Sequence, residues 1–594
     1  HGDKVVAAIL PGRKGKNPSG RVVRVLERAT EIMAVRVLRP AGDGAVLAQA
    51  TDPRCKGLFV LDFEGRKAPD KGDIVLAAPG DRLEGGGWAG RVVEVLGREF
   101  SLETQERIVK ANHSVPGPFP PIVLAEAANL GPEPDPEGLQ GREDLTNLGL
   151  VTIDGEQAKD FDDAVHVRAK GGGWILTVAI ADVSHYVQPG SALDREALER
   201  GNSFYFPRSV EPMLPEALSN GLCSLVPGRP RLAMAVEMEF DRLGRRTGQR
   251  CFAAVIRSEA RLTYTQVQGL FSRGEGRDES WGLMLEEAAK LAEILRNARA
   301  RQGSLDFDLP EPEIIQGLLD GSVGIRARER FFSHRLVEEF MISANECVAE
   351  ILTRAEKVLP YRVHPLPDPD KLSALFRLLT TAGVLPERPD EITPASLQSV
   401  LALVRDTERE FLVNRLMLRT MSQAGYSPTN EGHFGLASEC YCHFTSPIRR
   451  YADLLVHRVL KSVLARDGRI FRVKPLKRIC DGINRCERRA MEAEREMLKR
   501  AGILHLRDRI GDVFAGVISG VADFGFWVEL DSVLVEGLVR LSTLHDDYYE
   551  FRADEHRHLG RGTGRTFGLG QRVTVRLVNT SLDRLEVDLE VEDA

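Results

Sequence analysis

Residues 152–165 read TIDGEQAKDFDDAV and place four aspartates within ten positions, namely Asp154, Asp160, Asp162 and Asp163. An apolar run over residues 148–153 precedes the cluster and predicts a buried strand that delivers the carboxylates to a fixed place. Carboxylates this close repel one another, and a divalent cation between them keeps several of them ionised. Because the ligands are hard oxygen atoms, the stretch predicts a site for Mg²⁺ or Mn²⁺.

Two other interpretations of these aspartates are an EF-hand loop and a solvated acidic turn. An EF-hand loop that starts at Asp154 requires Gly at its sixth position and Glu at its twelfth, where this chain has Lys159 and Val165. The acidic turn stays open as an alternative, although apolar residues such as Phe161 are interleaved with the charges. The metal site is the favoured interpretation.

The composition indicates a chain of several folded domains. Its 594 residues, 43% of them hydrophobic, suffice for more than one core. The net charge of −7 argues against a histone-like or polybasic binder, so any contact with nucleic acid must use local basic surfaces. Eight cysteines without CxxC or zinc-ligand spacing predict free thiols in a reducing cytosol. No apolar run approaches the ~18 residues of a membrane span, so we expect a cytoplasmic protein without a membrane partner.

Both ends of the chain show β patterning. Short alternating runs in residues 1–110 predict small antiparallel barrels, which commonly bind single-stranded nucleic acid, although plain packing modules stay open. Residues 116–141, rich in Pro, Glu, Asp and Gly, predict a linker or an extended lead-in. Residues 511–594 predict a five-stranded barrel with rings for base stacking. Those rings are Phe524, Phe526 and Trp527; strand alternation places at least one of them in the core.

The middle of the chain mixes both periodicities. Strand-like runs at 174–180 and 232–238 come first, and helical patterns follow at 281–301, 333–357, 396–423, 448–465 and 476–508. This order predicts an α+β body over residues 142 to about 510. Residues 469–509 hold thirteen Lys or Arg against six Asp or Glu, which fits contact with a phosphate backbone or a solvated helix face.

A second chemical cluster occupies residues 443–453, HFTSPIRRYAD. Ser446 as N-cap and Pro447 as first helical residue predict a helix start. Arg449 and Arg450 in the first turn, with the free N–H groups of the helix end, predict an anion site of the kind that phosphates occupy. The alternative, which stays open, is a surface helix whose arginines pair with acidic side chains. The partners in that case are Glu439 and Asp453.

Three residues between the two clusters are candidates for nucleotide contact. Tyr205 lies in an aromatic triplet before a proline and Phe307 lies in the sequence LDFD, so base stacking and core packing are both open for these rings. Glu338 and Glu339 stand in a helical stretch with apolar neighbours. We expect at least one of the two glutamates to be partly buried and to require a partner.

Five motifs together resemble the bacterial ribonuclease II / ribonuclease R exoribonucleases, the RNB family. They are residues 152–165, 179–183 (AIADV), 220–225 (NGLCSL), 337–345 (VEEFMISAN) and 445–451 (TSPIRRY). The resemblance covers nearly the whole chain and is closer to ribonuclease R. It also implies an N-terminal truncation, because the chain starts inside what looks like the end of a first cold-shock barrel.

The resemblance implies a multidomain fold in which an α+β RNB catalytic body is flanked by small OB-type β-barrels, cold-shock-like at the N-terminus and S1 at the C-terminus. The implied division is a first-barrel remnant (1–27), a cold-shock-type OB barrel (28–115), a Pro/acidic linker (116–141), the RNB catalytic domain (142–510) and the S1 RNA-binding domain (511–594).

The implied activity is processive 3′-to-5′ hydrolysis of single-stranded RNA to 5′ nucleoside monophosphates by a two-metal mechanism, in a monomeric enzyme. Arg449 is implied to act in catalysis by steadying the scissile phosphate. The residues implied both to hold the metal and to act in catalysis are Asp154, Asp160, Asp162 and Asp163. The residues expected to contact RNA are Tyr205, Phe307, Glu338, Arg450, Phe524 and Phe526. Two other functions stay open: a catalytically silent RNA-binding relative, which loss of a metal aspartate or of Arg449 would favour, and a metal-dependent exonuclease that acts on DNA.

Overall fold

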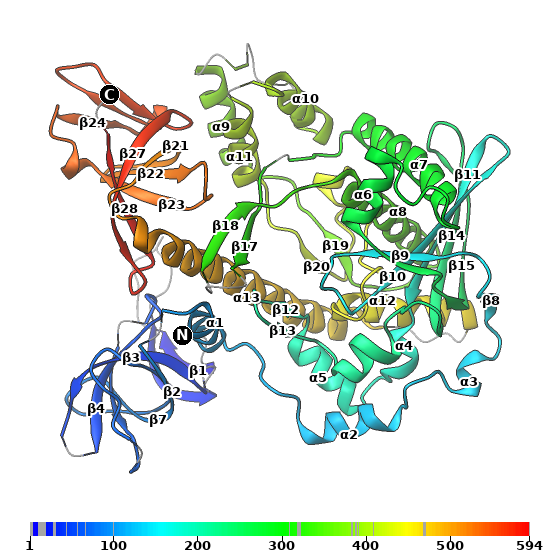
Figure 1. Cartoon of the computed structure of the whole chain (residues 1–594), viewed down its shortest axis with the longest axis horizontal. Helices are drawn as coiled ribbons and strands as arrows, with labels where there is room; N and C mark the ends of the chain where they lie inside the picture. The colour runs from blue at the N-terminus through cyan, green and yellow to red at the C-terminus, as the bar shows by residue number, and fades with distance from the viewer. Residues whose placement is uncertain are drawn as a thin grey trace.

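The structure is a computed structural model of the chain. It describes residues 4–9, 20–27, 31–42, 44–55, 57–65, 67–98, 100–307, 309–317, 322–381, 384–385, 389, 391–407, 409–466 and 471–592. An α+β body is joined to two small closed β-barrels, and the long helix α13 (Val473–Leu506) runs from the body to the barrels (Figure 1). The predicted fold class is confirmed. Within the described ranges, no helix is long and apolar enough to cross a membrane.

The N-terminal part contains one strand pair and one barrel. β1 (Lys4–Ile9) and β2 (Gly20–Glu27) pair antiparallel. They fall in the proposed first-barrel remnant, whose residues 1–3 and 10–19 lie outside the described residues. The barrel closes in the order β3-β4-β5-β7-β6 around buried side chains such as Val35 and Val75. Its strands are β3 (Met33–Pro40), β4 (Ala45–Ala50), β5 (Leu58–Asp62), β6 (Ile74–Arg82) and β7 (Trp88–Gly97).

Residues 116–141, predicted as a linker or an extended lead-in, contain two helices, α2 (Pro121–Asn129) and α3 (Pro136–Leu139). A proline opens each helix, at the position where a missing N–H leaves no hydrogen bond unmade, so the prolines start helices here rather than prevent them. Val123 and Ala127 of α2 are buried in the core of the body. The segment is therefore part of the packed structure.

A seven-stranded sheet in the order β16-β9-β10-β11-β14-β15-β8 forms the centre of the body. Its strands are β8 (Glu143–Leu145), β9 (Val151–Asp154), β10 (Asp163–Lys170), β11 (Gly173–Ala181), β14 (Pro230–Phe240), β15 (Arg246–Arg257) and β16 (Ala260–Thr263). The central strands pair antiparallel, whereas β8 and β16 pair parallel with their neighbours. The strands predicted at 174–180 and 232–238 are confirmed as β11 and β14.

Helices bury both faces of this sheet. One layer consists of α6 (Tyr264–Arg273), α7 (Gly282–Gln302) and α8 (Phe332–Arg354), and the other of α2, α5 (Ala192–Arg200), α12 (Tyr451–Ala465) and α13. Successive strand residues divide between the layers. Val178 and Met234 join the core that contains α7 and α8, whereas Ala179 and Ala235 join the core that contains α2, α5 and α13. The start of α12 packs in the second core and its later turns pack in the first.

Three helices form a separate small core: α9 (Pro369–Thr381), α10 (Pro394–Val404) and α11 (Glu410–Thr420). The single helix predicted over 396–423 is therefore wrong. It is interrupted at Asp406, whose φ of 59° is left-handed. Neither Gly nor Pro marks this interruption in the sequence.

The other helices and strand pairs between the two barrels are short. They are α1 (Leu102–Asn112), α4 (Val183–Tyr186) and three strand pairs, β12 (Phe204–Tyr205) with β13 (Val210–Glu211), β17 (Pro312–Gln316) with β18 (Val323–Ala327), and β19 (Tyr361–Val363) with β20 (Gly425–Ser427).

The C-terminal barrel closes in the order β21-β22-β23-β28-β27. Its strands are β21 (Val513–Ala522), β22 (Gly525–Leu530), β23 (Glu536–Arg540), β27 (Arg572–Ser581) and β28 (Glu586–Val591), and a separate sheet holds β24 (Tyr549–Arg552), β25 (Arg557–Gly560) and β26 (Thr566–Gly568). Phe526 is fully buried in the barrel and stacks on Phe567 at 4.9 Å between ring centroids. The prediction that Phe526 contacts RNA is therefore wrong, because its ring fills the core.

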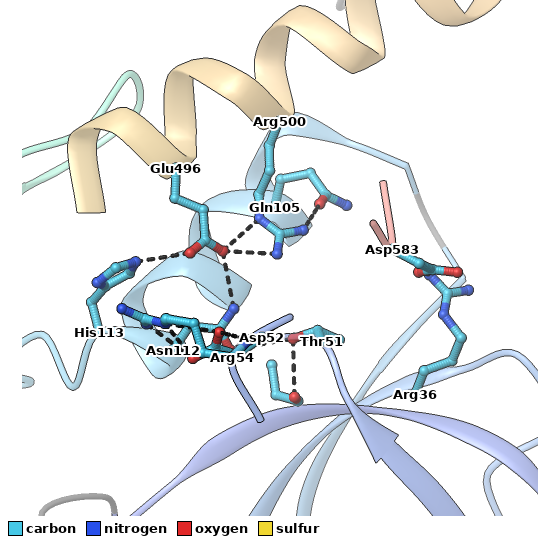
Figure 2. A network of polar contacts seen from close by, with 11 residues as sticks. Arg36, Thr51, Asp52, Arg54, Gln105, Asn112, His113, Glu496, Arg500 and Asp583 are labelled. Carbon is cyan, nitrogen blue, oxygen red and sulfur yellow. Dashed lines mark hydrogen bonds and ion pairs between the residues drawn. The ribbon is translucent and has the colours of Figure 1, made fainter. Parts of the chain in front are cut away.

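A buried polar network fixes the N-terminal barrel to α13 (Figure 2). Glu496 accepts hydrogen bonds from Asn112 at 3.0 Å and from Arg500 at 2.9 Å, and His113 Nε2 lies 2.8 Å from its other carboxylate oxygen. Asn112 ends α1, the helix that follows the barrel directly. The network therefore sets the position of the barrel on the body.

We expect Glu496→Gln to destabilise this junction near neutral pH by about 2 kcal/mol. Burial opposes ionisation of Glu496, but the hydrogen bond with His113 and the charge of Arg500 outweigh burial and lower the pKa to about 2. Because folding lowers this pKa, the stabilisation is complete above the ordinary value of 4.5 and is lost as the pH falls towards 2.

Hydrogen exchange of the α1 amides measures the local opening, and urea unfolding from about pH 7 to about pH 3 measures its pH dependence. Glu494→Gln, an exposed position on the same helix, is the matched control. Equal effects of the two substitutions would contradict the role given to Glu496. A loss of stability in Glu496→Gln that does not become smaller at acidic pH would contradict it as well.

Candidate active site

The acidic cluster lies at one edge of the central sheet. Asp154 closes β9 and Asp163 opens β10, and the two strands are antiparallel neighbours. Asp160 and Asp162 lie in the loop between them. The buried strand predicted from the apolar run over 148–153 is confirmed for its second half, since β9 begins at Val151 and residues 151–153 are all buried.

The loop that carries the aspartates is held by Ser224, in the motif over 220–225. Ser224 Oγ accepts the Phe161 N–H at 3.0 Å and donates to the Lys159 carbonyl at 2.7 Å. The Leu225 N–H donates to the Phe161 carbonyl at 3.0 Å. These bonds fix the loop backbone on both sides of Asp160.

The arginine cluster meets the aspartates directly. The Ile448 N–H donates to Asp162 Oδ1 at 2.9 Å across 286 residues of sequence, and Arg449 Nε lies 3.6 Å from Asp162 Oδ2. Arg449 remains 44% exposed at its side chain, so its guanidinium can also reach a ligand. Two regions identified separately in the sequence thus form one site.

The predicted helix start at Pro447 is wrong, because α12 begins at Tyr451 and residues 446–449 form a turn. The reason is tertiary pairing: Arg450 is extended and bridges to Asn202. The buried Asp453 accepts the Ser446 N–H at 2.8 Å and two N–H groups of Arg450 at 2.8 and 2.9 Å. Arg450 is therefore engaged within the protein, as the alternative interpretation expects.

Burial and mutual repulsion work against charge in the cluster. Burial, followed by the charge of Asp162, raises the pKa of Asp154 to about 7. Burial, followed by the charge of Asp154, raises the pKa of Asp163 to about 8, and burial raises the pKa of Asp162 well above its ordinary value. A nearby cation would reverse these shifts.

The four aspartates have the oxygen donors that a hard cation prefers, although their side chains do not converge on one point. Among the described residues, no three His, Cys, Asp or Glu side chains gather closely enough to hold a metal ion as they stand. Instead, Asp160 accepts from the Tyr205 hydroxyl at 3.3 Å. However, Asp154 Oδ2 and Asp162 Oδ2 are buried with no hydrogen-bond partner. Such orphaned oxygens are costly and are the donors that Mg²⁺ and Mn²⁺ prefer.

Two rings lie beside the aspartates, and sequence analysis found one of them. Tyr205 projects from β12, half exposed, with its hydroxyl on Asp160. Tyr264 opens α6 and stacks on His334 at 4.0 Å, and burial followed by the charges of Asp163 and Asp154 raises its pKa. The signal for Tyr264 is topological: β16 pairs parallel with β9 and ends beside Asp154.

Three other residues predicted to contact RNA make no contact with the four aspartates. Phe307 is half-buried and packs on the α9–α11 core. Glu338 is exposed and pairs with Arg330 at 3.1 Å, whereas Glu339 is the buried glutamate and pairs with Arg299 at 2.6 Å. The expectation that one glutamate is buried and partnered is therefore confirmed at Glu339. The third residue, Phe524, is exposed on the C-terminal barrel beside Trp527.

Comparisons with known proteins give consistent matches. Residues 142–466 match the model of the RNB domain, and residues 507–592 match the model of the S1 RNA binding domain. Ribonuclease R of Escherichia coli (strain K12) is 38% identical over 611 residues, covering 100% of this chain and 74% of its own, and ribonuclease R of Thermotoga maritima is 40% identical, covering 99% and 84%. The solved structure of Mycoplasma genitalium RNase R in complex with ribose methylated single-stranded RNA has a TM-score of 0.91 and 29% identity, covering 100% of this chain and 94% of that one.

We expect Ser224→Ala to loosen the acidic loop without disturbing the sheet. The substitution removes both hydrogen bonds of the serine hydroxyl and leaves the Phe161 N–H without its acceptor. Hydrogen exchange of the amides over 159–163 should accelerate by about tenfold, while β11 and β14 keep their protection. Ser219→Ala, a buried serine in the preceding helical turn, is the control. Unchanged exchange in Ser224→Ala would show that the hydroxyl does not hold the loop.

Proposed function

We propose how this site works from the premise that the chain belongs to the ribonuclease R family and is a 3′-to-5′ exoribonuclease. We infer that the substrate is single-stranded RNA and that it is degraded processively to 5′ nucleoside monophosphates. The observation that carries this proposal is the contact of Arg449 and the Ile448 N–H with Asp162. It places a phosphate-binding group beside a cluster of carboxylates.

The family is metal-dependent, and we infer Mg²⁺ from the all-oxygen donor set. The residues that would hold it are Asp154, Asp160, Asp162 and Asp163. When bound, two such ions supply an activated water and positive charge against the leaving oxygen.

The chain's own groups would place the scissile phosphate. Arg449 is half exposed beside Asp162 and donates to Ser446 Oγ at 3.0 Å, so its remaining N–H groups are oriented for a phosphate oxygen. Asp453 holds Arg450 and the preceding turn and thereby positions Arg449. The half-exposed ring of Tyr205 offers a face for the terminal base, and stacking of this kind tolerates any sequence. Phe307, Glu338 and Phe524 remain proposed contacts for RNA further along the strand.

We also retain the division into 1–27, 28–115, 116–141, 142–510 and 511–594 as a proposal. We also retain a monomeric enzyme as a proposal. The eight cysteines are all free, which supports a reducing, cytoplasmic setting.

Matched RNA and DNA oligomers labelled at the 5′ end, with and without EDTA, test the proposal against its two alternatives. We expect RNA to shorten from its 3′ end, DNA to persist, and EDTA to stop the reaction. Binding of RNA without hydrolysis would favour a catalytically silent relative. Equal degradation of both polymers would show that the site does not depend on the 2′-OH.

We expect Asp162→Asn to lower the single-turnover rate on RNA by at least about a hundredfold and to leave RNA affinity within about twofold. The substitution removes one negative charge and little volume, and the new side-chain oxygen still accepts the Ile448 N–H. Asp144→Asn, at an exposed aspartate of the same sheet, is the control. Near-normal turnover in Asp162→Asn would falsify the role of this carboxylate.

A further inference from the structure

A basic groove lies on α13, apart from the aspartates. It has a volume of about 710 Å³ and is bounded by the ends of α1 and α5, the N-terminal barrel and one face of α13. Its charged lining consists of Arg54, Glu199, Arg478, Arg485, Arg489 and Glu492. None of these residues belongs to the proposed catalytic set.

Ion pairing leaves the groove with an excess of positive charge. Arg54 pairs with Asp52 at 2.9 Å and with Glu492 at 3.5 Å, so these side chains largely neutralise one another. Arg478 and Arg485, in contrast, are exposed and have no hydrogen bond or ion pair with the described residues. Two guanidinium groups are thus free to bind a ligand.

Arg489, the third arginine that α13 contributes to the groove lining, is held in place by its neighbours. Arg489 covers the ring of Phe204 at 5.4 Å and donates to the Ser114 carbonyl at 3.3 Å. Its Nε is nevertheless buried with no hydrogen-bond partner within the described chain. Glu199 is the one acidic side chain of the lining that forms no ion pair with the described residues, so the arginines outnumber it.

The three arginines share one side of the helix. Arg478, Arg485 and Arg489 are separated by seven and then four residues, which places them on one face with axial spacings of about 10 Å and about 6 Å. Such a row can follow an extended polyanion, because each guanidinium presents a planar pair of N–H donors to phosphate oxygens.

The opposite wall of the groove is rigid. Asn112 and His113, at the end of α1, are fixed on α13 by Glu496 (Figure 2). Arg54 is also held on α13 through Glu492. The groove is therefore formed before any ligand arrives, and binding does not require the chain to order itself.

The groove lies behind the arginine turn of the active site. Cys486 in its lining packs against Gly201 so closely that a Cβ at Gly201 would lie 2.6 Å from Cys486 Cβ. The Gly201 carbonyl accepts the Tyr451 N–H at 3.0 Å, and the adjacent Asn202 bridges to Arg450. The segment around Gly201 and Asn202 therefore separates the groove from the turn that carries Arg449.

We propose that this α13 groove binds the sugar–phosphate backbone of RNA that lies outside the active site, upstream of the 3′ end being degraded. The inference rests on the proposed RNA substrate. The net charge of −7 is unfavourable for a polyanion overall, so the free guanidinium groups of Arg478 and Arg485 supply a local attraction. The lining contains no Phe, Tyr or Trp, and its one imidazole, His113, is held by Glu496, so contact is with phosphates and independent of sequence.

The test compares Arg478→Glu/Arg485→Glu with Lys477→Glu/Arg488→Glu. The control pair carries the same charge change on the same helix, at exposed positions that do not line the groove. Each variant is measured for affinity and hydrolysis on a short RNA of about 8 nucleotides and a long RNA of about 40 nucleotides, over a range of salt concentrations.

We expect the groove variant to bind the long RNA at least about tenfold more weakly and to lose about 1.5 from the slope of log affinity against log salt, as removal of two phosphate contacts requires. Its turnover of the short RNA should stay within about twofold of wild type. The milder Arg478→Gln/Arg485→Gln should show an intermediate loss, which excludes misfolding of the charge-reversed protein as the cause.

Other outcomes overturn the inference in distinguishable ways. Equal losses in the groove and control variants would reduce it to general electrostatics, and unchanged long-RNA affinity in the groove variant would reject the site. Binding of poly-glutamate that the groove variant alone abolishes, with RNA affinity unchanged, would assign the groove to an acidic protein. Failure of the wild-type protein to degrade any RNA would instead reject the proposed function.

Discussion

The active site depends on one buried carboxylate. Asp162 is 4% exposed, and it joins the loop between β9 and β10 to the turn before α12 through the Ile448 N–H and Arg449. Burying an ionised carboxylate is unfavourable unless donors and cations surround it, so the two segments that supply those groups must be held against it. The flanking Phe161 and Ile448 belong to the same hydrophobic core, which supplies that force.

The turn before α12 can come close to Asp162 because the two faces of the central sheet differ in side-chain size. In the middle of β10, β11 and β14, Val178 and Met234 face the core with α7 and α8, whereas Ala164, Ala179 and Ala235 face the core that contains the start of α12. Small residues reduce the distance between a sheet and a helix packed on it, because interiors are filled to nearly constant density. The alternation of large and small residues along the strands therefore brings the arginine turn towards the edge where the aspartates emerge.

Patterns local in the sequence predicted most of the fold and the members of the site, but not how distant segments constrain one another. The buried strand before Asp154 followed from apolar periodicity, and each of the two charged clusters was identified from its own residues, but their contact through Asp162 appears only in the structure. The start of α12 at Tyr451 could not be predicted from the sequence, because the bridge from Asn202 to Arg450 overrides the capping preference of Ser446. Phe526 also required knowledge of the barrel pleat, since an aromatic ring in a strand serves a core and a surface equally well.

The basic residues of α13 show why a charge count does not identify a binding face. The excess of positive charge over 469–509 divides by burial into two classes. Arg500 is 2% exposed and neutralises Glu496, so its charge serves the junction with the N-terminal barrel. Arg478 and Arg485 are exposed and make no ion pair within the described chain. Buried cations require partners within the protein, whereas solvated cations do not. Only the exposed arginines therefore keep their charge available to a polyanion. Arg478 and Arg485 both line the groove.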